Sequence, residues 1–291
     1  MLKHNLLEPS QPNRVVILGA SGFIGGALMK SFNTENTKVL ALGRREIDLL
    51  EPKAGSIIAG HLEPTDTLIV VSAEAPCKDA AMLTRNVQMM NSVCAAIIKV
   101  QPAHVIYVSS DAVYADSVEA LNESSCAEPD SIHGSMHLAR EIMLKETSNS
   151  PLAILRPTLV YGINDPHNGY GPNRFRRLAV ANEEINLFGE GEELRDHILV
   201  EDVAELIRLS AWQKSNGILN AATGIVTSFK EVAEMVISQF DSSSTITKSP
   251  RIGDMPHNGY RAFDPAATFA AFPSFEYTSL NNGLLSLKDD Q

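Results

Sequence analysis

The amino-acid sequence predicts an α/β fold: a doubly wound parallel sheet with helices on both faces and a smaller C-terminal lobe. Two observations lead to this prediction. Short aliphatic runs alternate with longer segments of helical periodicity over about the first 160 residues, and such alternation is typical of parallel strand–helix–strand units. The chain also has 291 residues, of which 44% are hydrophobic. It is therefore long enough to bury one large core, with or without a smaller lobe beside it.

The expected strands are short and aliphatic, which suits strands buried on both faces of a parallel sheet. They span residues 15–18, 38–42, 67–72, 104–108 and 152–155. Helical periodicity marks segments between these strands. The expected helices there span residues 27–32, 79–100 and 131–145.

Beyond residue 158 the pattern becomes looser. Short strands are expected at 185–188 and 197–200, and helices at 201–212 and 228–240. We therefore assign residues 1–160 to the sheet domain, and residues 161–291 mainly to the smaller lobe with the last strands of the sheet interleaved.

A glycine-rich turn joins the first expected strand to the first helix, where Gly19, Gly22 and Gly25 form GxxGxxG. The first glycine allows a tight turn, the second lets the backbone approach a pyrophosphate, and the third permits close helix–strand packing. The helix N-terminus adds N–H donors and a positive dipole. An ordinary glycine turn is the alternative. We predict a dinucleotide-binding domain whose first turn contributes Gly19, Ser21, Gly22, Phe23, Ile24 and Gly25.

The end of the second strand indicates which dinucleotide is bound. Enzymes that use NAD usually place Asp or Glu there to hold the ribose 2′-hydroxyl. This sequence instead has Gly43, Arg44 and Arg45, and a guanidinium can bind a 2′-phosphate through two hydrogen bonds. NADP is therefore favoured over NAD, with a solvated surface pair of arginines as the alternative.

Composition excludes several other classes of protein. The formal net charge of −11 argues against a nucleic-acid surface. Cys77, Cys94 and Cys126 are too few and too scattered for a disulfide framework. Residues 1–13 lack an apolar targeting segment, and no stretch approaches a membrane span, so a cytoplasmic location without membrane contact is expected.

Several further motifs follow one another in a recognisable order. They are Asn86, YVSSDAVY at 107–114, RPTLVYG at 156–162 and GEGEELRDHILVEDV at 189–203. With the glycine turn, they resemble the extended short-chain dehydrogenase/reductase family, specifically the NAD(P)-dependent nucleotide-sugar epimerases, dehydratases and reductases. The resemblance covers most of the chain and implies a Rossmann fold. It also implies cofactor contacts from Ser72, Ala73, Asn86, Ser109 and Arg156.

The same resemblance assigns roles at the end of the 104–108 strand. Ser110 takes the position of the catalytic Ser or Thr, which donates a hydrogen bond to the sugar oxygen. Asp111 matches the acid of the family's dehydratases, which pair it with a neighbouring Glu. Here that neighbour is Ala112, so a complete dehydratase pair is absent.

The chain departs from the family at its YxxxK motif, which occurs nowhere in the sequence. At the matching place stand His133 and His137, with Gly134 and Glu141 in the family's flanking pattern. An imidazole has an ordinary pKa of about 6.5, so His133 could exchange a proton with a sugar hydroxyl unaided. His137 would lie one helical turn further on, toward the ribose.

Three alternatives to that role remain open. The HxxxH spacing with Glu141 also suits a metal, although no further ligand cluster is present and no metal is predicted. In the second alternative, the site has kept binding and lost chemistry, and the protein is a catalytically silent cofactor and sugar-nucleotide binder. In the third, both histidines are structural.

Basic residues in the second half indicate an anionic sugar ligand. By the resemblance, Arg195 contacts the diphosphate and Arg261 lies near the nucleotide. Asn173 and Arg174 belong to a Gly- and Asn-rich segment with Arg176 and Arg177, which reads as an anion pocket or as a charged helix start. Surface salt bridges are the alternative for Arg195. The predicted ligand is a UDP-, dTDP- or GDP-hexose.

These observations rank the possible activities. Epimerase comes first and reductase second, and the missing acid partner weakens dehydratase. The helices at 79–100 and 131–145 lie where many relatives dimerise, so a homodimer is expected.

Overall fold

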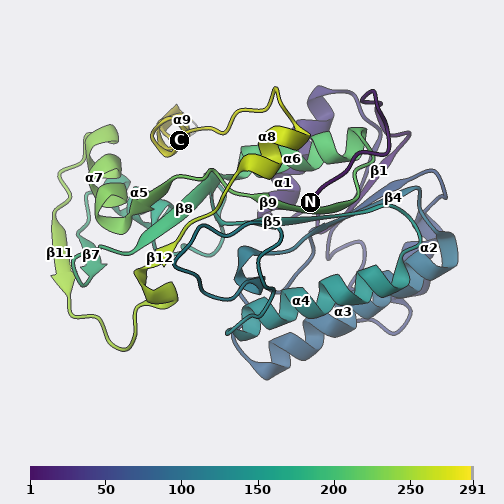
Figure 1. Ribbon diagram of the computed structural model, residues 1–291, viewed down its shortest axis with the longest axis horizontal. Coiled ribbons are helices and arrows are strands. Elements are labelled where there is room, and N and C mark those ends of the chain that lie inside the picture. Colours follow the sequence, from purple (N-terminus) through teal and green to yellow (C-terminus); the bar gives the residue numbers. More distant parts are fainter. Residues whose placement is uncertain (290–291) are drawn as a thin grey trace.

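A parallel sheet of six strands forms the centre of the molecule (Figure 1). The computed structural model describes residues 1–289. Its strand order is β2-β1-β3-β4-β5-β9, and every neighbouring pair is parallel. The strands are β1 (Val15–Leu18), β2 (Val39–Leu42), β3 (Thr67–Val70), β4 (His104–Val108), β5 (Leu152–Pro157) and β9 (Gly217–Ala221). The doubly wound parallel sheet expected from the sequence is confirmed.

Alternate side chains of each strand pack into two separate cores, one on each face of the sheet. Val16 and Leu18 of β1 pack into one core, and Val15 and Ile17 pack into the other. The first core is covered by α2 (Ala54–His61), α3 (Ala80–Val100) and α4 (Ile132–Thr147). The second is covered by α1 (Phe23–Thr34), α6 (Val200–Trp212) and α8 (Ala266–Ala271). Figure 1 shows α3 and α4 side by side on their face.

The smaller lobe lies beside the six-stranded sheet, at one end of the molecule (Figure 1). It has its own core around Phe175, Leu187 and Phe229. Strand β8 runs antiparallel to β10 and parallel to β12 and β6, and β7 pairs with β11. The lobe's elements are β6 (Leu159–Tyr161), α5 (Pro172–Ala181), β7 (Ile185–Phe188), β8 (Leu194–Leu199), β10 (Val226–Ser228), α7 (Phe229–Gln239), β11 (Ile246–Ser249), β12 (Tyr260–Arg261) and α9 (Leu280–Asp289).

The segment around Asn173 to Arg177 forms the start of helix α5. Pro172 occupies the first turn of α5, where its missing N–H leaves no bond unmade. Within residues 1–289, no helix is both long and apolar enough to cross a membrane.

Candidate functional site

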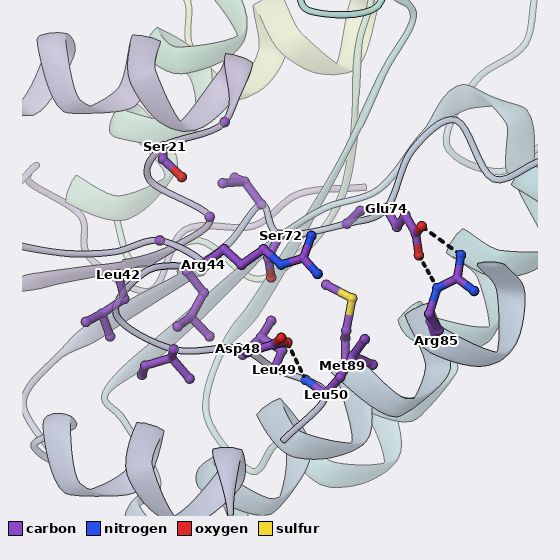
Figure 2. Close-up of a pocket in the computed structure, with 17 residues that line it drawn as sticks. Ser21, Leu42, Arg44, Asp48, Leu49, Leu50, Ser72, Glu74, Arg85 and Met89 are labelled. Carbon is purple, nitrogen blue, oxygen red and sulfur yellow. Dashed lines mark hydrogen bonds and ion pairs between the residues drawn. The ribbon is translucent and has the colours of Figure 1, made fainter. Parts of the chain in front are cut away.

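A cavity of about 290 Å³ opens at the carboxyl ends of β1, β2 and β3 (Figure 2). Strand β1 lies between β2 and β3, so the chain reverses its direction of winding at this edge. Ligands of open α/β sheets bind at such a switch point. The lining comes from the turn after β1, from residues 42–50, from residues 71–74 and from α3.

The glycine turn forms one wall of this cavity, and two of its glycines leave no room for a side chain. Gly19 has a φ of +96°, and a Cβ on it would lie 2.7 Å from the backbone nitrogen of Ser72. A Cβ on Gly25 would lie 2.1 Å from the carbonyl oxygen of Gly19. Gly22 is the N-cap of α1 and lines the cavity, so the unpaired N–H groups of the first turn of α1 lie at the cavity.

The two arginines after β2 differ in position. Arg44 lines the cavity, and Figure 2 shows its side chain reaching across toward Ser72 and Met89. Its guanidinium makes no hydrogen bond or ion pair with the described residues, which leaves it available to an anion. Arg45 is exposed and does not line the cavity.

The segment after β3 forms the opposite wall. Ser72 and Ala73 line the cavity, and Oγ of Ser72 is buried without a hydrogen-bond partner among the described residues. Asn86 lies behind this wall, where its amide bonds both the N–H and the carbonyl of Glu74. The role of Asn86 in this structure is therefore to hold the loop, while Ser72 offers the unpaired polar atom.

The two histidines lie next to each other at the start of α4. Their rings meet edge to face, with centroids 4.8 Å apart. The N–H of Cys77 donates to Nδ1 of His133 at 3.2 Å, and Nδ1 of His137 lies 2.8 Å from the hydroxyl of Tyr107. Burial lowers the pKa of both imidazoles, and the charge of Arg140 lowers that of His137 further. Both rings are therefore neutral at pH 7.

Ser110 and Asp111 lie beside His133 because Gly134 lets α4 approach them. A Cβ on Gly134 would lie 1.9 Å from the carbonyl oxygen of Ala112. Oγ of Ser110 caps the short 3-10 helix η1 (Asp111–Val113) and accepts from the N–H of Ala112. The Asp111 carboxylate is close enough to oppose the lowering of the His133 pKa. The structure thus brings Ser110, Asp111, His133 and His137 together at one corner.

Arg261, which the sequence placed near the nucleotide, is almost fully engaged inside the protein. It is 2% exposed. Its Nε bonds the carboxylate of Asp111 at 3.0 Å, its Nη1 bonds Asp116 at 3.0 Å, and its Nη2 donates to the carbonyl of Asp111 at 2.6 Å. With two carboxylates already paired to it, the guanidinium contributes no net positive charge to a ligand.

Ser109 and Arg156 also have internal partners. Ser109 donates to Glu141 at 2.6 Å, and Arg156 bonds both oxygens of Glu141 at 2.8 and 2.6 Å. Glu141 itself is fully buried. This network ties α4 to β4 and β5, so these two residues position the helix that carries the histidines.

An arginine that the sequence analysis missed lies beside Arg195. Glu193, which is buried, accepts from Arg195 at 2.9 Å and from Arg251 at 3.4 Å. Two guanidiniums sharing one carboxylate leave a net positive charge, which suits an anionic ligand. Arg251 is 58 residues from Glu193 and belongs to no motif noticed in the sequence, so only the fold brings them together.

Asn173 and Arg174, both predicted to contact substrate, differ in burial and in hydrogen bonding. The amide of Asn173 bonds the N–H of Gly162 and the carbonyl of Val160, whereas Arg174 is exposed. Arg176 and Arg177 contact the carbonyls of Ile163 and Asp165. The four side chains therefore do not converge on one anion pocket.

The sequence matches the NAD dependent epimerase/dehydratase family over residues 15–222. The chain belongs to this family. The resemblance to extended short-chain dehydrogenases/reductases is thereby confirmed, and the family indicates a nicotinamide cofactor.

Solved structures share the fold of this family member over nearly its whole length. UDP-glucose 4-epimerase of Thermus thermophilus, in complex with NAD, is 20% identical, with a TM-score of 0.83 over 95% of this chain and 98% of that one. UDP-N-acetylglucosamine 4-epimerase of Methanobrevibacter ruminantium, in complex with UDP-N-acetylmuramic acid, is 21% identical, with a TM-score of 0.80 over 96% and 98%. A GDP-L-fucose synthetase of Naegleria fowleri, bound to NADP, is 16% identical, with a TM-score of 0.82 over 97% and 94%.

The residues that line the cavity of this family member suit a dinucleotide. The cavity combines a glycine wall that side chains would fill, a helix N-terminus, an unpaired buried Ser72 hydroxyl and a free Arg44 guanidinium. Among residues 1–289, no group of three or more His, Cys, Asp or Glu side chains could hold a metal ion.

Proposed function

We propose that this protein is a nicotinamide-dependent enzyme that modifies a nucleotide sugar, with epimerisation as its first candidate reaction. One observation carries the proposal: His133 lies at one corner with Ser110 and Asp111, next to the loop that walls the dinucleotide cavity. A titratable group at that corner could meet a sugar oxygen. The cofactor, when bound, would supply the hydride chemistry.

The residues that would hold the cofactor follow from the cavity lining. The N–H groups at the start of α1 would face the pyrophosphate, and the Ser72 hydroxyl would gain a partner. We further propose NADP as the cofactor, because Arg44 reaches into the cavity without an internal partner.

The cofactor proposal is tested by replacing each arginine after β2 in turn. Arg44→Ala should weaken NADP(H) binding about 10- to 100-fold, which is the cost of losing a charge-assisted contact, and leave NAD(H) binding unchanged. Arg45→Ala is the matched control, since Arg45 does not line the cavity. Calorimetric titration of each variant with both cofactors measures this. Equal losses for NAD(H) and NADP(H) would remove the basis for preferring NADP.

At the sugar oxygen, His133 would act through Nε2, because its Nδ1 is occupied by the Cys77 N–H. A backbone N–H can only donate, so Nδ1 accepts and the proton of the neutral ring is on Nε2. To take a proton from a sugar hydroxyl, the ring must first move its own proton to Nδ1. That shift gives up the bond from Cys77, at a cost of about 1 kcal/mol. Ser110 would hold the same oxygen from the other side.

This tautomer specifically favours reduction as a second candidate. A carbonyl oxygen needs a hydrogen-bond donor, and Nε2–H of His133 is one without any rearrangement. Reduction needs only this donor: Nε2–H would stabilise the developing alkoxide, and solvent would supply the proton of the alcohol, because a neutral ring that gave up Nε2–H would become an imidazolate. Epimerisation also requires that a hydroxyl proton be taken, which this tautomer cannot do without rearrangement.

Incubation with a panel of nucleotide sugars and NADP(H) in deuterated water tests these activities. Mass spectrometry distinguishes added hydride, exchanged carbon-bound hydrogen and lost water. His133→Phe should reduce turnover about 10²- to 10⁴-fold without loss of cofactor affinity, and His167→Phe, at an exposed position, should not. Undiminished turnover in His133→Phe would contradict the proposed role. Cofactor binding without turnover of any sugar would favour a catalytically silent binder.

We also propose a homodimer formed through α3 and α4. Both helices run along one face of the molecule (Figure 1), and each exposes one large apolar side chain, Ile98 on α3 and Ile142 on α4. Such residues on adjacent helices favour burial against a second copy. A cytoplasmic location stays a prediction.

A further inference from the structure

We propose that Tyr107 is a positioning residue that fixes His137 as a neutral ring with its proton on Nε2, so that this nitrogen donates to an acceptor oxygen of the bound cofactor or substrate. Tyr107 lies on β4 and His137 on α4, and their hydroxyl and Nδ1 atoms are 2.8 Å apart. The tautomer assignment stands on this geometry alone. The ligand contact rests on the proposed function.

The direction of the hydrogen bond follows from what each group can do. Among the described residues, the Tyr107 hydroxyl has no acceptor other than Nδ1 of His137, and its ring is 1% exposed. If Nδ1–H donated instead, the phenolic proton would be buried without a partner, at a cost of about 1–3 kcal/mol. Tyr107 therefore donates, and the proton of the neutral imidazole is on Nε2.

Arg140 reinforces this arrangement from the next turn of α4. Its guanidinium carbon lies 5.2 Å from the centroid of the Tyr107 ring, and its Nη2 donates to the carbonyl of Ser72 at 2.6 Å. Arg140 is fully buried, and no described carboxylate forms an ion pair with it. An uncompensated cation so close to His137 opposes a second positive charge on that ring.

Arg140 therefore supplies the permanent positive charge behind the corner, and His137 supplies only a directed N–H. Nε2 of His137 has no hydrogen-bond partner among the described residues, and the residue is 5% exposed beside the partly exposed His133. The two rings thus present two N–H donors side by side, since Nδ1 of each is occupied. Such a pair suits a carbonyl or hydroxyl oxygen.

Long-range ¹H–¹⁵N NMR of histidine side chains tests the assignment in the ligand-free protein, because it reports the protonated nitrogen of each ring. His133→Asn and His137→Asn identify the two signals. In the unmodified protein at pH 7, we expect both rings to be neutral with the proton on Nε2. In Tyr107→Phe, the His137 signal should move toward a mixture of tautomers. Tyr161→Phe is the matched control, because its hydroxyl is also buried but bonds no described residue.

Each outcome decides the proposal. A proton on Nδ1 of His137 in the unmodified protein would overturn it, whether or not Tyr107→Phe folds. An unchanged His137 tautomer in a folded Tyr107→Phe variant would show that Tyr107 does not set it. Titration with NADP⁺ alone and with UDP-glucose alone should shift the ¹⁵N resonance of Nε2 of His137 in one of the two experiments. The ligand that causes the shift is the one that supplies the acceptor oxygen. A shift in neither experiment would refute the ligand contact. None of these readouts requires turnover, so an inactive enzyme would leave the tautomer result intact.

Discussion

Individual histidines in this protein differ in how strongly burial disfavours their charged form. His104 is fully buried, and its Nε2 lies 2.7 Å from the carbonyl of Ser215, which only a protonated nitrogen can bond. Burial lowers the pKa of His104 to about 4 and that of His197 to about 3. His104 bonds only the carbonyl of Ser215, away from the candidate site, so it acts on stability.

Stability should therefore fall as the pH falls. The pKa of His104 is about 4 in the folded chain and about 6.5 in the unfolded chain, so only the unfolded state gains a proton between these values. The His104 contribution is complete above pH 6.5 and is lost toward pH 4, which amounts to about 2 kcal/mol between pH 7 and pH 5. Urea unfolding of His104→Gln at both pH values should show a smaller difference than the unmodified protein, whereas exposed His167→Gln should not. An equal pH dependence in His104→Gln would exclude His104 as its source.

The residues of the candidate site were predictable from sequence where local spacing defines them. The glycine turn needs only its own three positions, and His133 and His137 are one helical turn apart. Arg251 was not identified, and Tyr107, although part of the motif at 107–114, was not identified as a partner of His137. Their partners come from other elements: Tyr107 meets His137 across the interface of β4 and α4. Such contacts depend on helix–sheet registration, which one sequence does not encode in any short pattern.

At the scale of elements, α1 provides a direct comparison of two adjacent glycines. A Cβ on Gly25 would meet the backbone of Gly19 and Ala20, whereas a Cβ on Gly26 would meet nothing within 4 Å. Gly25→Ala should destabilise the fold by about 1–3 kcal/mol or more. Gly26→Ala should stabilise it by about 0.5–1 kcal/mol, because alanine favours a helix. Chemical unfolding measures both variants, and equal effects would mean that α1 does not pack as closely on the turn as described.

The elements were predictable in proportion to how regular their patterns are. The strands at 15–18, 104–108 and 185–188 have the expected bounds, since each is a compact apolar run. Helix α2 was missed because Gly55 and Gly60 weaken its helical signal. Strand β9 was missed because its apolar run is interrupted by Asn220, which bonds Tyr114 inside the protein.

For the whole molecule, the testable question is whether two copies associate. Ile98 is 64% exposed and Ile142 is 51% exposed on the faces of α3 and α4. If these faces bury each other in a homodimer, Ile98→Glu and Ile142→Glu should yield monomers, because unpaired carboxylates resist burial. Ile225→Glu, at a 65% exposed site in another part of the chain, is the control. Light scattering coupled to size exclusion gives the mass, and a monomer before any substitution would reject the dimer.

The buried Arg261 also fixes how the two halves of the molecule can move. It comes from β12 of the smaller lobe, yet it bonds Asp111, which is 150 residues away at the end of β4. Swinging the lobe open as a rigid body would pull a cation away from two carboxylates, at a cost of about 3–5 kcal/mol. The Arg261 contacts therefore resist rigid-body opening of the smaller lobe. Any strain that a bound ligand places on the lobe is therefore transmitted to Asp111, the residue next to Ser110.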